Sequence, residues 1–249
     1  MSKTKTELIG ILKRSVSEWN ALDLQDADLQ DANLQYADLQ YADLQDADLQ
    51  YANLRNANLR NANLRNANLR NVNLQYANLQ YADLCNANLQ DADLQYANLQ
   101  YANLRNADLR NANLRYANPQ DANLRNANLR NANLQGANLQ DADLQDADLR
   151  GARFPAPQMV LLANWRTVSD ALCADLMRYD ACSHPDQNAF DEWVETGKCP
   201  YTGCSVQRAA NFQEKKGLWK AGTSKRPINL MVAVIREKCK DSDWHRKGE

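Results

Sequence analysis

The stretch NANLRNANLRNANLR, residues 56–70, repeats the same five letters three times. The period continues on both sides, so that residues 21–150 form 26 consecutive pentads. The fourth letter is Leu except where Pro119 replaces it, the second is nearly always Ala, and the third is always Asp or Asn. The first letter is mostly Asp, Asn or Tyr, and the fifth is Gln or Arg apart from Cys85. A period kept this strictly indicates a fold that is itself periodic.

Neither a helix nor a continuous strand can use a period of five. In an α-helix the leucines would advance by about 140° per pentad and spiral over every face. In a strand they would point alternately to opposite faces, because five is odd. The pattern instead fits a short extended piece with Ala and Leu inward and Asp or Asn outward, followed by a two-residue corner. Four such sides close a square coil of about 20 residues, and the coils stack about 4.8 Å apart.

The run A(D/N)LXX over residues 21–154 resembles the pentapeptide-repeat family. This resemblance implies a mainly β fold, a right-handed quadrilateral β-helix. The segment ELIGILKRSVSEWN, within residues 1–20, resembles the helix that caps the N-terminal end of many members, and its apolar residues recur at helical spacing. Because an open coil end exposes unpaired backbone groups, a cap is physically required.

Some members of this family resemble DNA in shape and charge, bind type II topoisomerases and protect them from quinolones. A DNA mimic needs a mostly negative surface, because duplex DNA carries one charge about every 1.7 Å of its axis. Here residues 21–50 contain eight Asp and no Arg, whereas residues 51–75 contain four Arg and no acidic residue. These bands weaken the DNA-mimic interpretation. They also form no continuous basic face, which argues against direct nucleic-acid binding.

Tyrosines are expected to gather on two adjacent corners, because residues 20 positions apart stack in a square coil. Tyr is favoured at protein interfaces, so these corners suggest a face for a protein partner. Stacking of similar side chains along a solenoid edge would explain the same pattern without any partner. The candidate binding residues are Tyr36, Tyr76, Tyr96 and Tyr116 on one corner, and Tyr41, Tyr81 and Tyr101 on the next.

No catalytic residue is predicted in the repeat region. Residues 21–154 contain neither His nor Glu, and their aspartates are matched to no base or nucleophile. The formal net charge is −2, no apolar run approaches the length of a membrane span, and charges interrupt every apolar pair near the N-terminus. We therefore expect a cytoplasmic protein without a membrane segment.

Residues 155–249 have an ordinary globular composition, which indicates a small C-terminal domain. Apolar residues at helical spacing predict four helices, and we expect the α-helical domain to close the far end of the β-helix and to mediate any homo-oligomer. The predicted helices lie within residues 167–182, 185–197, 205–220 and 226–239.

The motifs CSH and CPYTGC supply Cys182, His184, Cys199 and Cys204. Three Cys and one His are a valid ligand set for structural zinc, because thiolate and imidazole suit a tetrahedral Zn²⁺ ion. The Cys-x-His spacing is tighter than usual, however, and unpaired Cys is among the most buried residue types, so buried thiols are the alternative. A catalytic Cys paired with His184 or His245 would lack a recognisable orienting carboxylate.

The sequence therefore predicts a non-enzymatic scaffold or protein-binding protein that needs no cofactor, with an unidentified protein as its partner. Its parts would be a capping helix (1–20), a β-helix (21–154) and an α-helical domain (155–249). One alternative is a DNA mimic that binds and protects a type II topoisomerase. Another is an enzyme or a zinc module in the C-terminal domain.

Overall fold

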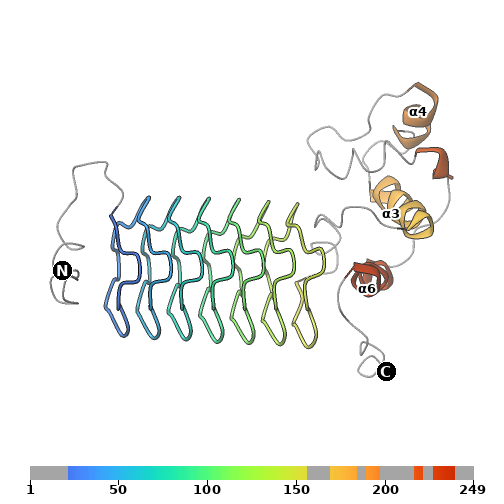
Figure 1. Ribbon diagram of the computed structural model, residues 1–249. Coiled ribbons are helices and arrows are strands. Elements are labelled where there is room, and N and C mark those ends of the chain that lie inside the picture. Colours follow the sequence, from blue (N-terminus) through green and yellow to red (C-terminus); the bar gives the residue numbers. More distant parts are fainter. Residues whose placement is uncertain (1–21, 156–168, 184–188, 197–215, 221–226, 239–249) are drawn as a thin grey trace.

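The computed structural model describes residues 22–155, 169–183, 189–196, 216–220 and 227–238. Residues 22–155 form a rod of stacked coils, and the C-terminal helices lie beyond its last coil (Figure 1). The capping helix predicted over residues 1–20 lies outside the described residues and stays a prediction.

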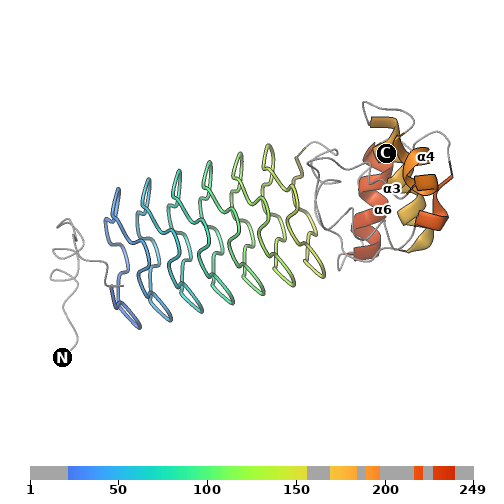
Figure 2. The same ribbon diagram turned by 90° about the horizontal axis from the view of Figure 1, so that it is seen from above.

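Each coil of the rod contains 20 residues and four sides, as the period predicts (Figure 2). Parallel bridges join third-letter residues that lie 20 positions apart, from the pair Asp23–Asp43 to the pair Asn133–Arg153. The bridges are isolated, and the described part of the rod contains no continuous strand, because the chain turns again after three extended residues. The mainly β class therefore takes the form of a β-helix built from single bridges.

Every backbone N–H group of a typical pentad is paired. In residues 76–80 the first, third and fourth residues donate to carbonyl groups of neighbouring coils at 2.7–3.0 Å, and the second donates across the preceding turn at 3.1 Å. The fifth N–H, that of Gln80, donates to the side-chain oxygen of Asn78 at 3.2 Å. The same side-chain bond recurs along the rod. Asp and Asn place a side-chain oxygen at the position where it can accept this bond from the fifth N–H. This bond explains why the third letter is always Asp or Asn.

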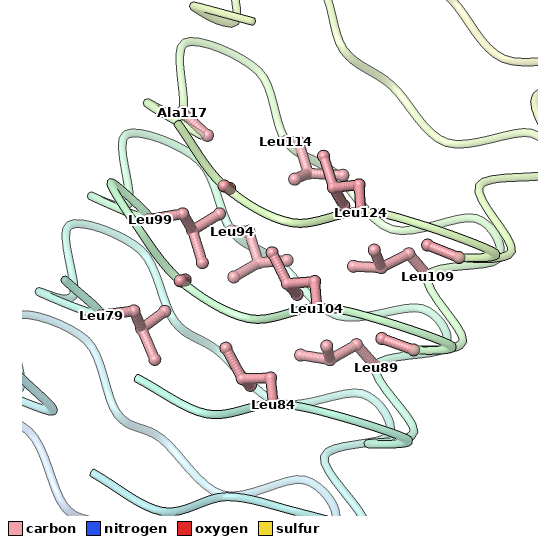
Figure 3. Close-up of a cluster of buried hydrophobic side chains, with 14 of the residues drawn as sticks. Leu79, Leu84, Leu89, Leu94, Leu99, Leu104, Leu109, Leu114, Ala117 and Leu124 are labelled. Atoms are coloured by element: carbon pink, nitrogen blue, oxygen red, sulfur yellow. The ribbon is translucent and has the colours of Figure 1, made fainter. Parts of the chain in front are cut away.

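The core of the rod is a column of leucines beside a column of alanines on each side. The fourth-letter leucines from Leu24 to Leu149 are at most 3 % exposed. Figure 3 shows Leu84, Leu89 and Leu94 pointing into the coil, with their equivalents repeated in the next coil. Each buried Leu contributes about 1.5–3 kcal/mol relative to an exposed one. The prediction that Ala and Leu face inward is confirmed.

Each corner is a four-residue turn that runs from the fourth letter of one pentad to the second letter of the next. The third residue of this turn is the first letter of the next pentad. In 24 non-glycine cases this residue has a φ of 53–61°, and Gly136 and Gly151 have φ values of 73° and 71°. Asn, Asp and Gly tolerate this left-handed region, whereas other residues avoid it. This positive φ explains why the first letter is most often Asn or Asp. The eight tyrosines at the first letter are exceptions to this preference.

Pro119 removes one hydrogen bond from the ladder. Proline has no N–H, so the bond that other fourth-letter residues donate to the next coil is missing. Among the described third-letter pairs, Asn118–Asn138 is the one without a bridge, although the Asn138 N–H still donates to the Ala117 carbonyl at 3.0 Å. The ladder resumes with the pair Asn123–Asp143. The defect is therefore confined to a single coil contact.

The C-terminal segment contains three described α-helices and one short 3-10 helix. These elements are α3 (Asp170–Ser183), α4 (Ala189–Thr196), η1 (Lys216–Leu218) and α6 (Pro227–Lys238). Helices therefore occupy three of the four predicted positions. Most of the range 205–220 lies outside the described residues, and its described end holds η1.

Helix α3 packs against α6 through buried apolar side chains, among them Met177 of α3 and Ile235 of α6. A polar contact joins the same two helices at the start of α3. The Ser169 Oγ accepts a hydrogen bond from the Leu172 N–H at 3.3 Å, and the Ser169 N–H and hydroxyl donate to the Glu237 carboxylate at 2.5 and 2.7 Å. Whether these helices form a separate domain that closes the rod stays a prediction.

Candidate functional site

Charge is distributed unevenly around the rod. Two consecutive sides of each coil carry most of this charge. In one coil they are formed by residues 42–50, including the corner between the two sides. We call these residues, together with their equivalents 20 positions apart in the other coils, the charged faces. Of the 17 Asp in residues 22–150, eleven lie on the charged faces, and so do seven of the ten Arg. Most of the formal charge of the rod is therefore confined to half of its sides.

We call the tyrosine face the side opposite the second charged face. It consists of residues 76–81, with both corners, and of the equivalent residues in the other coils. The hexapeptide YANLQY occupies it at residues 76–81 and again at 96–101, so its centre exposes only Tyr, Asn and Gln. Interface centres in proteins are depleted of charge and enriched in Tyr, and the tyrosine face has this composition.

The predicted tyrosine columns are present, and five of the seven candidate rings stack. The Tyr76 and Tyr96 ring centroids lie 4.9 Å apart with an interplanar angle of 2°, and those of Tyr96 and Tyr116 lie 5.2 Å apart. On the adjacent corner the Tyr81 and Tyr101 centroids lie 4.9 Å apart. The five stacked rings remain 46–49 % exposed, so their outer edges form a regular surface.

Stacking alone does not account for tyrosine at these corners. All eight tyrosines have φ values of 57–61°, where a left-handed conformation costs roughly 1–2 kcal/mol, while a stacked aromatic pair returns about 0.5–1.5 kcal/mol. Among the described residues, no ring stacks on Tyr36, Tyr41 or Tyr51, yet they share the same φ. Because the positive φ recurs at the described corners whatever the residue, it belongs to the coil geometry, and stacking alone leaves the choice of tyrosine unexplained.

Both stacked columns have a charged group at each end: Arg55 and Arg115 flank the column from Tyr76 to Tyr116, and Arg60 and Asp121 flank the column of Tyr81 and Tyr101. The guanidinium carbons of Arg55 and Arg60 lie 5.7 and 5.8 Å from the first stacked ring of each column, within cation–π range. The sequence contains a signal for these contacts, because each Arg precedes its Tyr by 21 residues. At the far end of the second column, the negative charge of Asp121 raises the pKa of the Tyr101 phenol, and desolvation and a hydrogen bond to Asp121 act in the same direction.

Amide side chains order the surface between the two tyrosine columns. The Gln80 amide donates to the Gln100 carbonyl oxygen at 2.8 Å, and the Gln100 amide donates to Gln120 at 3.3 Å. These side chains are already held in place before any partner arrives. Binding to the tyrosine face would therefore lose less side-chain entropy than binding to a mobile surface.

The predicted zinc ligands are not brought together by the described residues. Cys182 lies near the end of α3, whereas His184, Cys199 and Cys204 fall outside the described part. Within the described ranges, no group of three His, Cys, Asp or Glu residues could hold a metal ion. Cys182 is exposed, so the alternative of a buried thiol is wrong for this cysteine. The zinc set itself stays a prediction.

The comparisons with known proteins concern the repeat region. A sequence profile of the family described as pentapeptide repeats matches residues 21–50, 52–91, 87–118 and 120–154, in 8 copies. A search of curated proteins returns no match. No described helix has the length and apolar character needed to cross a membrane.

Several solved structures are similar to this chain. HetL, a pentapeptide repeat protein involved in heterocyst differentiation regulation in the cyanobacterium Nostoc sp. strain PCC 7120, is 33 % identical over 59 % of this chain and 74 % of its own, with a TM-score of 0.48. The plasmid-mediated fluoroquinolone resistance protein QnrB1 is 17 % identical over 57 % of this chain and 87 % of its own, with a TM-score of 0.41. Rfr23 from the cyanobacterium Cyanothece 51142 is 38 % identical over 43 % and 63 %, with a TM-score of 0.25.

Proposed function

Because the chain belongs to the pentapeptide-repeat family, we propose that it is a non-enzymatic scaffold that binds a protein partner through the tyrosine face. The observation that carries this proposal is the uncharged centre of that face, where four of the five stacked tyrosines remain about half exposed. A partner that docks there displaces water from the exposed edges of the aromatic rings. No charged group of this face is desolvated at the centre of the contact, so that cost is avoided.

The chemistry of the rod supports a non-enzymatic role. Its interior consists of Leu and Ala columns, which offer no acid or base, and the thiol of Cys85 is buried beside them. Its outward carboxylates lie beside amides and guanidinium groups, and residues 22–154 contain no His to act with them. General acid–base catalysis needs such a partner group at hydrogen-bond distance from a substrate.

The charged faces give little support to the alternative of a DNA mimic for a type II topoisomerase. A mimic needs a continuous acidic surface, whereas seven Arg are interspersed among the Asp of these faces. Arg110 pairs with Asp108 at 2.6 Å, and Arg65 pairs with Asp83 at 3.5 Å, so part of the negative charge is neutralised locally. The tyrosine face, which carries no charged residue in its two central coils at residues 76–81 and 96–101, resembles a protein interface more closely than it resembles DNA.

Changing Tyr76, Tyr81 and Tyr96 together to Ser tests the proposal. We expect this variant, used as bait in an extract of the native host, to lose at least nine-tenths of a partner that the wild-type chain captures. Ser retains the Cβ atom and with it the backbone strain, so the loss of three stacked pairs, at about 0.5–1.5 kcal/mol each, should lower the melting temperature by roughly 3–18 °C and leave the rod folded at the temperature of the capture.

The matched control changes Asn66, Asn86 and Asn106 to Ser. These residues occupy the same turn position with the same positive φ, but they lie on the corner between the charged faces. The control should capture the partner as well as the wild type does. If the tyrosine variant captured every wild-type partner and merely melted earlier, the columns would be structural and the proposal would be wrong.

A further inference from the structure

We infer that the partner of the tyrosine face is a second copy of this chain, and that the two rods pack face to face and antiparallel. This inference rests on the proposed function of that face and names its partner. It places the homo-oligomer contact on the rod, whereas the sequence alone suggested the C-terminal helices.

The repeat distance of the face is the first reason. Its rings recur at 4.9–5.2 Å along the rod, and its amide chain follows the same coil spacing. A partner that makes the same contact in successive coils must share this repeat. A second rod has it by construction, and identical side chains at this spacing can interdigitate, as they do between paired sheets.

The charges at the two ends of the face select the antiparallel arrangement. On the corner that carries Tyr81 and Tyr101, Arg60 lies before the stacked rings, and Asp121 and Asp141 follow them. A two-fold axis across the rods at the level of Tyr101 would bring Arg60 of each copy opposite Asp141 of the other. Because the axis generates both pairs, each end of the interface contains one pair of opposite charges, while Asp121 lies opposite Tyr81 and Arg55 lies opposite Gln135.

The parallel alternative sets like charges together. A two-fold axis along the rods would exchange the two corners at the same level, so that Arg60 of one copy would face Arg55 of the other. Asp121 would face Arg115, so this arrangement combines two like pairs with two opposite pairs, whereas the antiparallel one contains two opposite pairs and no like pair. Like charges across an interface oppose association, whereas opposite charges fix its register. The antiparallel arrangement is therefore the one that the sequence of charges along this side favours.

The exposed area is of the size that a dimer needs. A fully covered aromatic side chain removes roughly 150–250 Å² from water, so five half-exposed rings offer roughly 400–600 Å². The amides between the columns and the flanking arginines add to this area. A stable interface buries about 800 Å² on each partner, so the five rings alone supply half of that area or more.

Two charge-reversal variants of the full chain test the inference by sedimentation velocity over a dilution series. The wild type should dimerise, and Arg60→Glu and Asp141→Lys should each raise the dissociation constant at least tenfold, because each places like charges together twice. An equimolar mixture of the two variants should regain dimer, because both cross-copy pairs then have opposite charges. The control Arg70→Glu, at the equivalent turn position on the charged faces, should behave as the wild type does.

The outcomes separate this inference from the proposed function. A wild-type chain that stays monomeric at every concentration overturns the second copy as partner, while loss of another protein by the triple tyrosine variant would still support the proposed binding face. Two weakened variants whose mixture does not recover overturn the antiparallel register. Asp141 has a φ of 58°, which Asn tolerates better than Lys does. If the Asp141→Lys variant does not fold, Asp141→Asn takes its place. The mixture of Asp141→Asn with Arg60→Glu must then dimerise more tightly than Arg60→Glu alone.

Discussion

Replacing Leu89 by Ala is expected to lower the free energy of unfolding by about 2–5 kcal/mol. The Leu89 side chain is fully buried, and Figure 3 shows it in one column with Leu109, its equivalent in the next coil. The coils are held at a fixed spacing by backbone hydrogen bonds, so the walls cannot collapse into the cavity that the substitution leaves. Urea unfolding followed by far-UV circular dichroism measures the loss as a shift in midpoint.

The matched control for Leu89→Ala is Gln135→Ala, which truncates an exposed fifth-letter side chain in the same rod. Its midpoint should change by the equivalent of no more than about 0.5 kcal/mol. If Leu89→Ala were as mild as this control, the leucine columns would not form the core that holds the coils together.

Replacing Gly136 by Ala is expected to destabilise the rod by about 2–3 kcal/mol, because two unfavourable effects add. A Cβ atom at this position would overlap the Tyr116 ring, so the last ring of the stacked column would have to move. The residue also has a φ of 73°, which alanine tolerates poorly. The same urea experiment measures the change.

A double substitution separates the cost of the positive φ from the cost of the overlap with the Tyr116 ring. Changing Tyr116 to Ser removes the ring, so Gly136→Ala in that background should cost only the conformational part, about 1–2 kcal/mol. Gly217→Ala is the control, because a Cβ there would meet nothing within 4 Å. An equal loss with and without the Tyr116 ring would show that the column does not press on the next coil.

The coil geometry of the rod was predictable from the sequence because it is local and repeated. Each pentad makes the same bonds, so one period determines the number of sides, the direction of Ala and Leu, and the columns of residues 20 apart. The tyrosine columns followed from this arithmetic. The role of the third letter did not, because the bond from the Gln80 N–H to the Asn78 side chain depends on the exact shape of the turn.

The strain at the tyrosine corners was hidden for the same reason. Composition shows that the first letter is mostly Asp, Asn or Tyr, but only the backbone shows that this letter has a positive φ and that tyrosine is the anomalous choice. The C-terminal cysteines posed a different difficulty. Whether Cys182 meets its predicted co-ligands depends on how segments far apart in the chain are placed, and spacing along the sequence does not determine this.

The most direct test of the tyrosine face as a docking surface is hydroxyl-radical footprinting of each tyrosine, read by mass spectrometry. The chain is labelled when dilute, when concentrated and in host extract. Tyr76, Tyr81, Tyr96 and Tyr101 should lose at least half of their labelling in the concentrated sample, in the extract or in both. Tyr51, which lies on another corner at 57 % exposure, should be unchanged. Labelling of the four stacked tyrosines that stays equal to the dilute sample in both conditions would contradict the account.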